Sequence, residues 1–108
     1  SGDDPTATSF ILKGGKGTIS VTANIVPEII SEICKLSLDG DSQGALDLDC
    51  KLEELNEMLF VESNPIPIKW LLNRIGRISD GIRLPLSPFS HEYHNDAEEI
   101  LKKLNLLN

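Results

Sequence analysis

The fold of this chain is decided at residues 14–24, which read Gly14-Gly15-Lys16-Gly17-Thr18-Ile19-Ser20-Val21-Thr22-Ala23-Asn24. The paired glycines predict a turn, because glycine takes positive φ angles without a steric penalty. The run from Thr18 to Thr22 is β-branched except for Ser20 and carries no charge, which favours a strand buried on both faces of a parallel sheet. A lone strand cannot satisfy its own backbone hydrogen bonds. The pattern therefore predicts that the chain is a piece of a larger protein.

The remainder of the chain is patterned as helices. One helix is expected from about Pro5 to Lys13, with Asp4 as its cap and Ala7, Phe10 and Ile11 on its apolar face. A second is expected from about Pro27 to Leu38, and a third is expected after a cap at Asp41 or Ser42. The third helix carries one apolar stripe, made of Leu48, Leu52, Leu55 and Leu59. Two further helices are predicted, one from a cap at Asn64 to Gly76 and one capped near Asn95.

Composition limits the class of partner. The 108 residues are 40% apolar and 25% charged, which is typical of one soluble globular unit. Their formal charge of -7, from 17 acidic and 10 basic residues, disfavours nucleic acid and anionic membranes as partners. The sequence contains no apolar run of about 18 residues and no basic signal-peptide start, so we expect a cytoplasmic location. Cys34 and Cys50 are interpreted as small buried apolar residues.

Several residue groups could carry chemistry. His91 and His94 could approach one metal ion, but no third ligand stands at a matching spacing, and surface histidines at a helix start are the favoured interpretation. Asp3 and Asp4 could act as paired carboxylates in acid–base chemistry, although Asp4 is already explained as a helix cap.

Two other patterns have structural explanations. The glycines of residues 14–17 precede a strand, whereas a phosphate-binding loop follows a strand and opens a helix, so a simple turn is favoured. Trp70 and Arg74 lie four residues apart and are expected to stack on one helix face.

The same residues resemble a known family. Four motifs in the same order and spacing are similar to the C-terminal part of the dihydrodipicolinate synthase family. They are residues 1–4, residues 14–24, residues 59–70 with their Asn64-Pro65-Ile66-Pro67 core, and residues 83–86. The resemblance covers nearly the whole chain and favours this synthase over related pyruvate lyases.

The resemblance implies a TIM (β/α)8 barrel parent, a fold that typically takes about 250 residues. Residues 1–38 would be the C-terminal end of the barrel, with residues 18–22 as its eighth strand between the seventh and eighth helices. Residues 39–108 would be the C-terminal α-helical domain.

The resemblance also implies a reaction. Family members condense pyruvate with aspartate-4-semialdehyde in the diaminopimelate route to lysine, through a Schiff base on a barrel lysine. That lysine and its tyrosine partner would lie upstream of Ser1, and no lysine here matches the catalytic position. Ile19 would help to hold pyruvate through its backbone, and Gly2 and Asp3 would lie beside the semialdehyde. No cofactor and no metal is expected.

These implications predict a parent enzyme, usually a homotetramer, and a 108-residue chain that is inactive alone. The open edges of the predicted strand also predict that the isolated chain self-associates or rearranges over residues 1–24. The alternative is a free-standing helical module, residues 27–108, that binds a partner helix.

Overall fold

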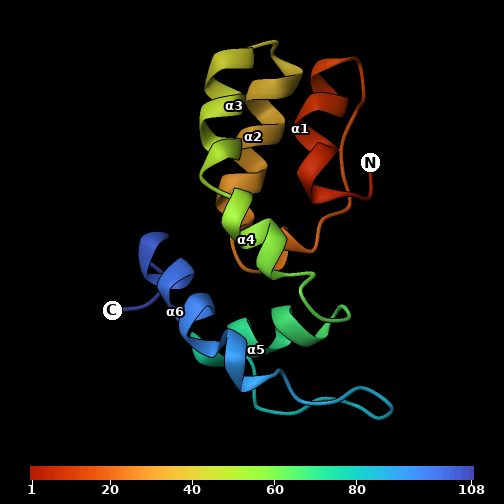
Figure 1. The fold of residues 1–108 in the computed structure, drawn as a ribbon. Coiled ribbons are helices and arrows are strands. Elements are labelled where there is room, and N and C mark those ends of the chain that lie inside the picture. The colour runs from red at the N-terminus through yellow and green to blue at the C-terminus, as the bar shows by residue number, and fades with distance from the viewer. The chain divides into compact units, whose positions relative to one another are not determined.

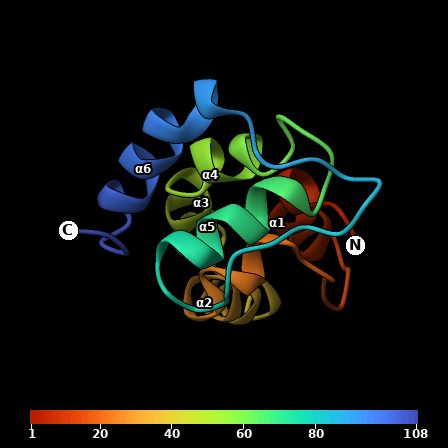
Figure 2. The same cartoon turned by 90° about the horizontal axis from the view of Figure 1, so that it is seen from below.

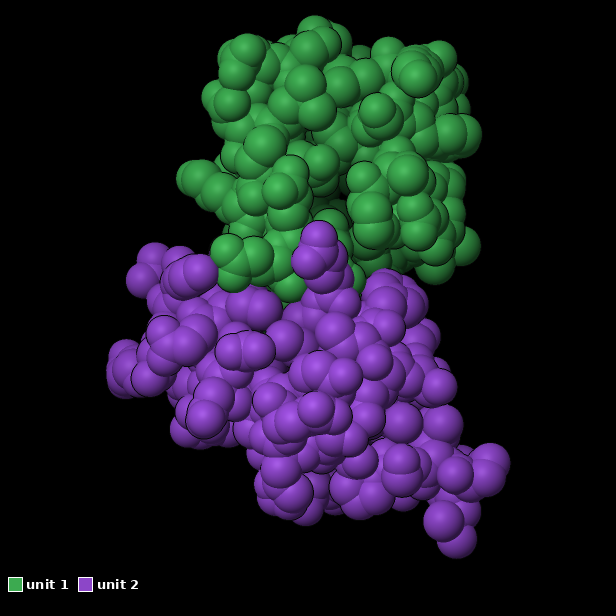
Figure 3. Space-filling view, viewed as in Figure 1, with its two compact units in different colours: residues 1–56 green, residues 57–108 purple.

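Every regular element of the chain is a helix. The computed structural model describes residues 1–108 and contains six α-helices and two short 3-10 helices. The residues form two compact units, unit 1 (residues 1–56) and unit 2 (residues 57–108), shown in different colours in Figure 3. The boundary between them falls inside helix α4 (Glu53–Met58). The predicted division of the parent at residues 38 and 39 stays a prediction.

Unit 1 is built on three helices that pack side by side, α1 (Asp4–Leu12), α2 (Pro27–Leu38) and α3 (Ser42–Cys50) (Figures 1 and 2). The range of α2 is the predicted one, with Pro27 in its first turn. Asp41 caps α3 as expected, because its carboxylate accepts a hydrogen bond from the amide of Gly44 at 3.0 Å. Gly14 ends α1 with a φ of 112°, which an L-residue rarely adopts.

The predicted strand at residues 18–22 is wrong for this chain, because no strand forms there. Outside the local turns, only Ser1 offers this segment backbone hydrogen bonds. Its terminal ammonium donates to the carbonyl of Gly17 at 3.0 Å, and its carbonyl accepts from the amide of Ile19 at 2.8 Å. These two bonds flank Thr18, as in one step of a parallel ladder, but a single step does not make a strand. After it the chain turns into the 3-10 helix η1 (Thr22–Asn24).

Two expectations for α1 are also wrong. The residue at the N-cap is Asp3, and Asp4 lies inside the helix with 6% of its surface exposed. The reason is a long-range one, since the Asp4 carboxylate bonds to residues 20–22 rather than to its own helix. Of the expected apolar face, Ala7 and Ile11 are buried, but Phe10 is 48% exposed.

The predicted leucine-striped helix is two helices rather than one. After α3 the amides of Lys51 and Leu52 bond to carbonyls three residues back, which tightens the turn and redirects the chain into α4. The stripe itself is largely confirmed, because Leu52, Leu55 and Leu59 are fully buried. Cys50, expected to be buried, is exposed in the last turn of α3, and both cysteines are free.

Unit 2 holds α5 (Ile66–Arg74), the 3-10 helix η2 (His91–Tyr93) and α6 (His94–Lys103). Pro65, not the predicted Asn64, occupies the N-cap position of α5, and Gly76 follows α5 with the expected positive φ of 79°. A long loop leaves α5, turns back and returns to η2 (Figure 2). The buried apolar residues of the unit come mainly from α5, α6 and the loop before η2, and they include Ile68, Leu71, Phe89, Ala97, Ile100 and Leu101.

Candidate functional site

The three residues predicted to contact substrate lie close together along the Ser1 link. Gly2 and Asp3 follow Ser1 directly, and Ile19 donates its amide to the Ser1 carbonyl at 2.8 Å. All three are exposed, and Ile19 is 86% exposed. Residues separated by 16 or more positions in the sequence therefore share one edge of unit 1. Their role in substrate binding stays a prediction.

Asp4 holds this edge in place. Its carboxylate accepts hydrogen bonds from the hydroxyl of Ser20 and from the amides of Val21, at 3.0 Å, and Thr22, at 3.1 Å. The amide of Ala23 in turn donates to the Ser20 hydroxyl at 2.9 Å. A buried carboxylate with several donors is well satisfied. Asp4 thus caps η1 from a distant position in the sequence, and both of its carboxylate oxygens accept hydrogen bonds.

Asp3 differs from Asp4 in every respect that matters for chemistry. Its side chain is exposed, and its carboxylate accepts only the hydroxyl of Thr6, at 2.6 Å. The paired-carboxylate hypothesis therefore has one free member rather than two. No local pattern in the sequence distinguishes the two aspartates, since the partners of Asp4 lie 16 to 18 residues away.

Two more polar contacts cross unit 1. The hydroxyl of Thr22 donates to Oδ1 of Asn56, and the hydroxyl of Thr8 donates to Oδ1 of Asp49 at 2.9 Å. Burial raises the pKa of Asp49 above its ordinary value of 3.8, and the Thr8 hydrogen bond offsets part of that rise. These contacts tie α1 and η1 to the chain on either side of Leu52.

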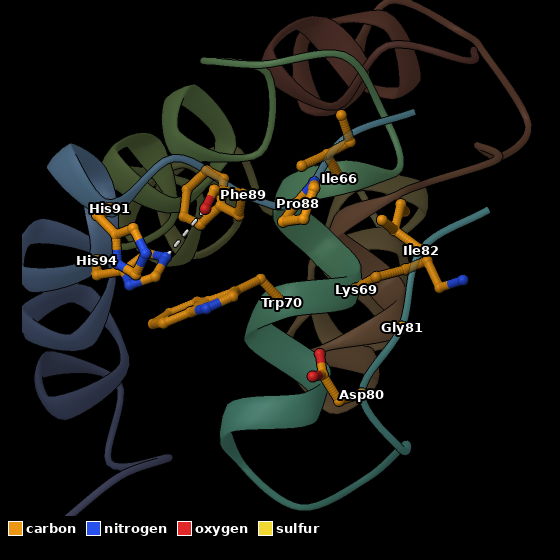
Figure 4. Close-up of a pocket in the computed structure, with 10 residues that line it drawn as sticks. All are labelled: Ile66, Lys69, Trp70, Asp80, Gly81, Ile82, Pro88, Phe89, His91 and His94. Carbon is orange, nitrogen blue, oxygen red and sulfur yellow. Dashed lines mark hydrogen bonds between the residues drawn. The ribbon is translucent and has the colours of Figure 1, made fainter. Parts of the chain in front are cut away.

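Unit 2 contains a cavity of about 370 Å³ with an aromatic wall (Figure 4). The ring of His94 stacks on Trp70, with centroids 4.4 Å apart and planes 25° from parallel. Phe89 lies 5.5 Å from Trp70, and its carbonyl lies 3.2 Å from Nε2 of His94. His94 is therefore a packing residue, and no group of three or more metal-ligating side chains exists in the chain.

The predicted stack of Trp70 on Arg74 is not seen. Trp70 uses His94 instead, and Nε of Arg74 donates to Oε1 of Glu98 at 2.9 Å. His94 is remote in sequence from Trp70, so helical spacing could not reveal the pair. The aromatic content of the segment around residues 89–94 was the available signal.

A second anchor in unit 2 precedes η2. The Glu62 carboxylate accepts both the amide of Ser90, at 2.9 Å, and its hydroxyl. These hydrogen bonds hold the pKa of Glu62 below its ordinary value of 4.5, and His94 lowers it further through its charge. No helix in the structure is both long and apolar enough to cross a bilayer.

The chain is similar to known proteins over nearly its whole length. A family model described as the dihydrodipicolinate synthetase family matches residues 1–104. The 4-hydroxy-tetrahydrodipicolinate synthase of Idiomarina loihiensis is 51% identical over 108 residues, which are 100% of this chain and 36% of that protein. The Legionella pneumophila enzyme of the same name is 46% identical over 107 residues, 99% of this chain and 37% of that protein.

Solved structures show the same fold. The crystal structure of the chloride-inhibited dihydrodipicolinate synthase from Acinetobacter baumannii, complexed with pyruvate, superposes with a TM-score of 0.95 at 46% identity. The match covers 99% of this chain and 37% of that one, so the chain spans little more than a third of the length of its relatives. From the family model and these likenesses together, the chain belongs to the dihydrodipicolinate synthetase family.

Proposed function

We propose that the chain is the C-terminal part of a synthase that condenses pyruvate with aspartate-4-semialdehyde in lysine biosynthesis, and that it does not catalyse this reaction alone. Family membership over residues 1–104 carries the first half of the proposal. In it, residues 1–38 close a barrel, residues 39–108 form the appended helical domain, and the whole enzyme is a homotetramer.

The environment of the lysines supports inactivity. A Schiff-base lysine must be neutral, which requires a desolvated site or a neighbouring cation. No lysine of this chain is buried, and only Lys69 is half-buried while the others are exposed. The side chain that would form the imine is therefore expected on the part of the enzyme that this chain does not span.

Borohydride trapping tests the proposal directly. The chain is incubated with pyruvate, reduced with borohydride, and its mass is measured by mass spectrometry. We expect no adduct, whereas the Acinetobacter baumannii enzyme, as positive control, is labelled. A pyruvyl adduct on this chain would overturn the inactivity, and a Lys69→Gln variant would show whether the half-buried lysine carries it.

Complementation tests the parent activity. The remaining part of a relative, such as the Idiomarina loihiensis enzyme, is produced separately and mixed with this chain. We expect synthase activity only in the mixture. Within it, an Ile19→Pro exchange, which removes the amide that Ser1 holds, should lower activity far more than Phe10→Ala on the exposed side of α1. Unchanged activity of the Ile19 variant would exclude that residue from the site.

Self-association is the expected state of the isolated chain. The extended residues 17–20 present backbone groups with one partner, Ser1, and Ile19 beside them is 86% exposed. Light scattering should give a mass above that of the 11.9 kDa monomer, and Ile19→Lys should reduce it. A monodisperse monomer with slow hydrogen exchange throughout residues 17–22 would contradict this. No observation favours the helical-module alternative, since the family match includes residues 1–26 as well as the helices.

A further inference from the structure

Unit 2 carries a groove that the proposed function does not use. The aromatic-walled cavity of about 370 Å³ and a more open hollow of about 480 Å³ share Lys69, Asp80, Gly81 and Ile82. The two spaces therefore meet beside α5, and the second continues to Arg83. Sites for small ligands usually have volumes of about 300 to 1,000 Å³. The groove is large enough for a compact metabolite.

One end of the groove is aromatic. Trp70, Phe89, His91 and His94 line it, and Figure 4 shows the two histidines at one end, with Lys69 and Ile82 at the other and Trp70 between. Trp70 is fixed by the stacked ring of His94 on one side and by Phe89, which is only 5% exposed. Part of the indole still faces the cavity. Such a surface suits a flat apolar ring.

The residues that line both hollows include two opposite charges without partners. Lys69 comes from α5 and Asp80 from the following loop, and both line the two hollows. Neither forms an ion pair or a side-chain hydrogen bond with any other residue. A simple anion would be repelled by the Asp80 carboxylate, and a simple cation would be repelled by the Lys69 ammonium. A ligand that carries both charges satisfies both residues.

We propose that this groove binds an α-amino acid with an aromatic side chain. Its carboxylate would pair with Lys69, its ammonium with Asp80, and its ring would lie against Trp70. The net charge of -7 on the chain acts against a purely anionic ligand and leaves a zwitterion nearly unaffected.

Intrinsic fluorescence reads this site, because Trp70 is the only tryptophan in the chain. The 108-residue chain is titrated with phenylalanine, whose own fluorescence does not overlap the tryptophan emission. We expect a saturable change in Trp70 emission, with a dissociation constant on the order of 1 mM for so small a ligand. No saturable change would overturn the proposal.

Matched ligands separate the three contacts. 3-Phenylpropionate lacks the ammonium, phenethylamine lacks the carboxylate and alanine lacks the ring. Each should bind about tenfold more weakly than phenylalanine or worse, since each loses one charge-assisted bond or the ring contact. Equal binding of 3-phenylpropionate and phenylalanine would show an unselective apolar groove, and the proposal would fail.

Two variants test the charges in the protein. Lys69→Gln and Asp80→Asn should each weaken phenylalanine binding about tenfold. Lys51→Gln, which removes an exposed lysine from unit 1, should leave it unchanged. Circular dichroism checks that each variant keeps its helices. If a variant does not fold, the ligand series on the unaltered chain still tests the proposal. Unchanged affinity in both groove variants would refute the assignment.

Discussion

The two units of this chain bury different kinds of side chain. Every buried polar residue lies in unit 1, whereas the buried side chains of unit 2 are all apolar. The buried polar residues are Asp4, Thr8, Thr22, Ser37 and Asn56. Buried polar groups are tolerated when they are hydrogen-bonded, and in unit 1 most of them are.

The difference follows from what each unit has to satisfy. Residues 17–22 have the composition of a sheet strand, but the chain offers them no sheet, so side chains must take part of its place. Asp4 accepts the amides of Val21 and Thr22, and Ser1 accepts that of Ile19. In unit 2 most of the buried side chains lie on helices, which satisfy their own backbone, so its core can be apolar. The stability of unit 1 should therefore be most sensitive to the loss of buried hydrogen bonds, and that of unit 2 to the loss of apolar packing.

The largest effect is expected from a cavity in unit 2. Leu101 on α6 is fully buried, so Leu101→Ala should lower the free energy of unfolding by about 4 kcal/mol. Leu84 lies in the same unit but is 91% exposed, and Leu84→Ala should change stability by less than about 0.5 kcal/mol. Urea unfolding followed by Trp70 fluorescence measures both.

Hydrogen exchange shows whether the units are separate. In Leu101→Ala the amides of residues 57–108 should exchange faster, while those of α1 and α2 keep most of their protection. An equal loss of protection in both units would mean that the chain unfolds as one body. The two units could then not be assigned separate sources of stability.

A smaller loss is expected when the Asp4 contacts in unit 1 are broken. In Asp4→Asn the amide oxygen can still accept from Val21 and Thr22, but the side chain loses its charge and its NH2 group cannot accept from the Ser20 hydroxyl. We expect a loss of about 2 kcal/mol and faster exchange at the amides of Val21 and Thr22. Asp3→Asn is the matched control, because Asp3 is exposed and lacks these contacts. Equal stability of the two variants would show that Asp4 is not what holds residues 20–22.

Local patterns predicted the helices well, and the reason is that helices are local. The range of α2 followed from Pro27 and the isoleucine spacing, and the cap of α3 followed from Asp41. The strand at residues 18–22 failed because a strand depends on neighbours that this chain does not supply. The prediction that Asp4 caps its own helix failed because a capping rule considers only nearby amides. The amides that Asp4 binds are 17 and 18 residues away.

The candidate sites show the same limit. Gly2 and Ile19 carry no reactive group and no spacing signal, so only the resemblance to the synthase family drew attention to them, whereas the Asp3 carboxylate was also a candidate from the sequence alone. The Trp70 groove was missed because its wall comes from α5, a loop, η2 and the start of α6 together. Helical spacing led from Trp70 to Arg74, whereas the ring that stacks on Trp70 is His94, 24 positions away.

The smallest expected effect is a pH response of opposite sign in the two units. The pKa of Asp49 is raised in the folded state by burial, so its contribution to unit 1 is present below its ordinary value of 3.8 and is lost as pH rises through the folded pKa. The pKa of Glu62 is lowered by its hydrogen bonds to Ser90, so its contribution to unit 2 is present above 4.5 and is lost as pH falls through the folded pKa.

Acidification from about pH 6 to pH 3 should thus strengthen the Asp49 contribution and weaken that of Glu62. Urea titrations over this range, followed by Trp70 fluorescence for unit 2 and by amide resonances of α1 for unit 1, measure the two slopes. Glu62→Gln should reduce the acid loss in unit 2 only, and Asp49→Asn should alter the slope in unit 1 only. If one of these variants changed both slopes equally, the pH dependence of stability in the two units would come from shared titrating groups. The difference between their interiors would then not explain it.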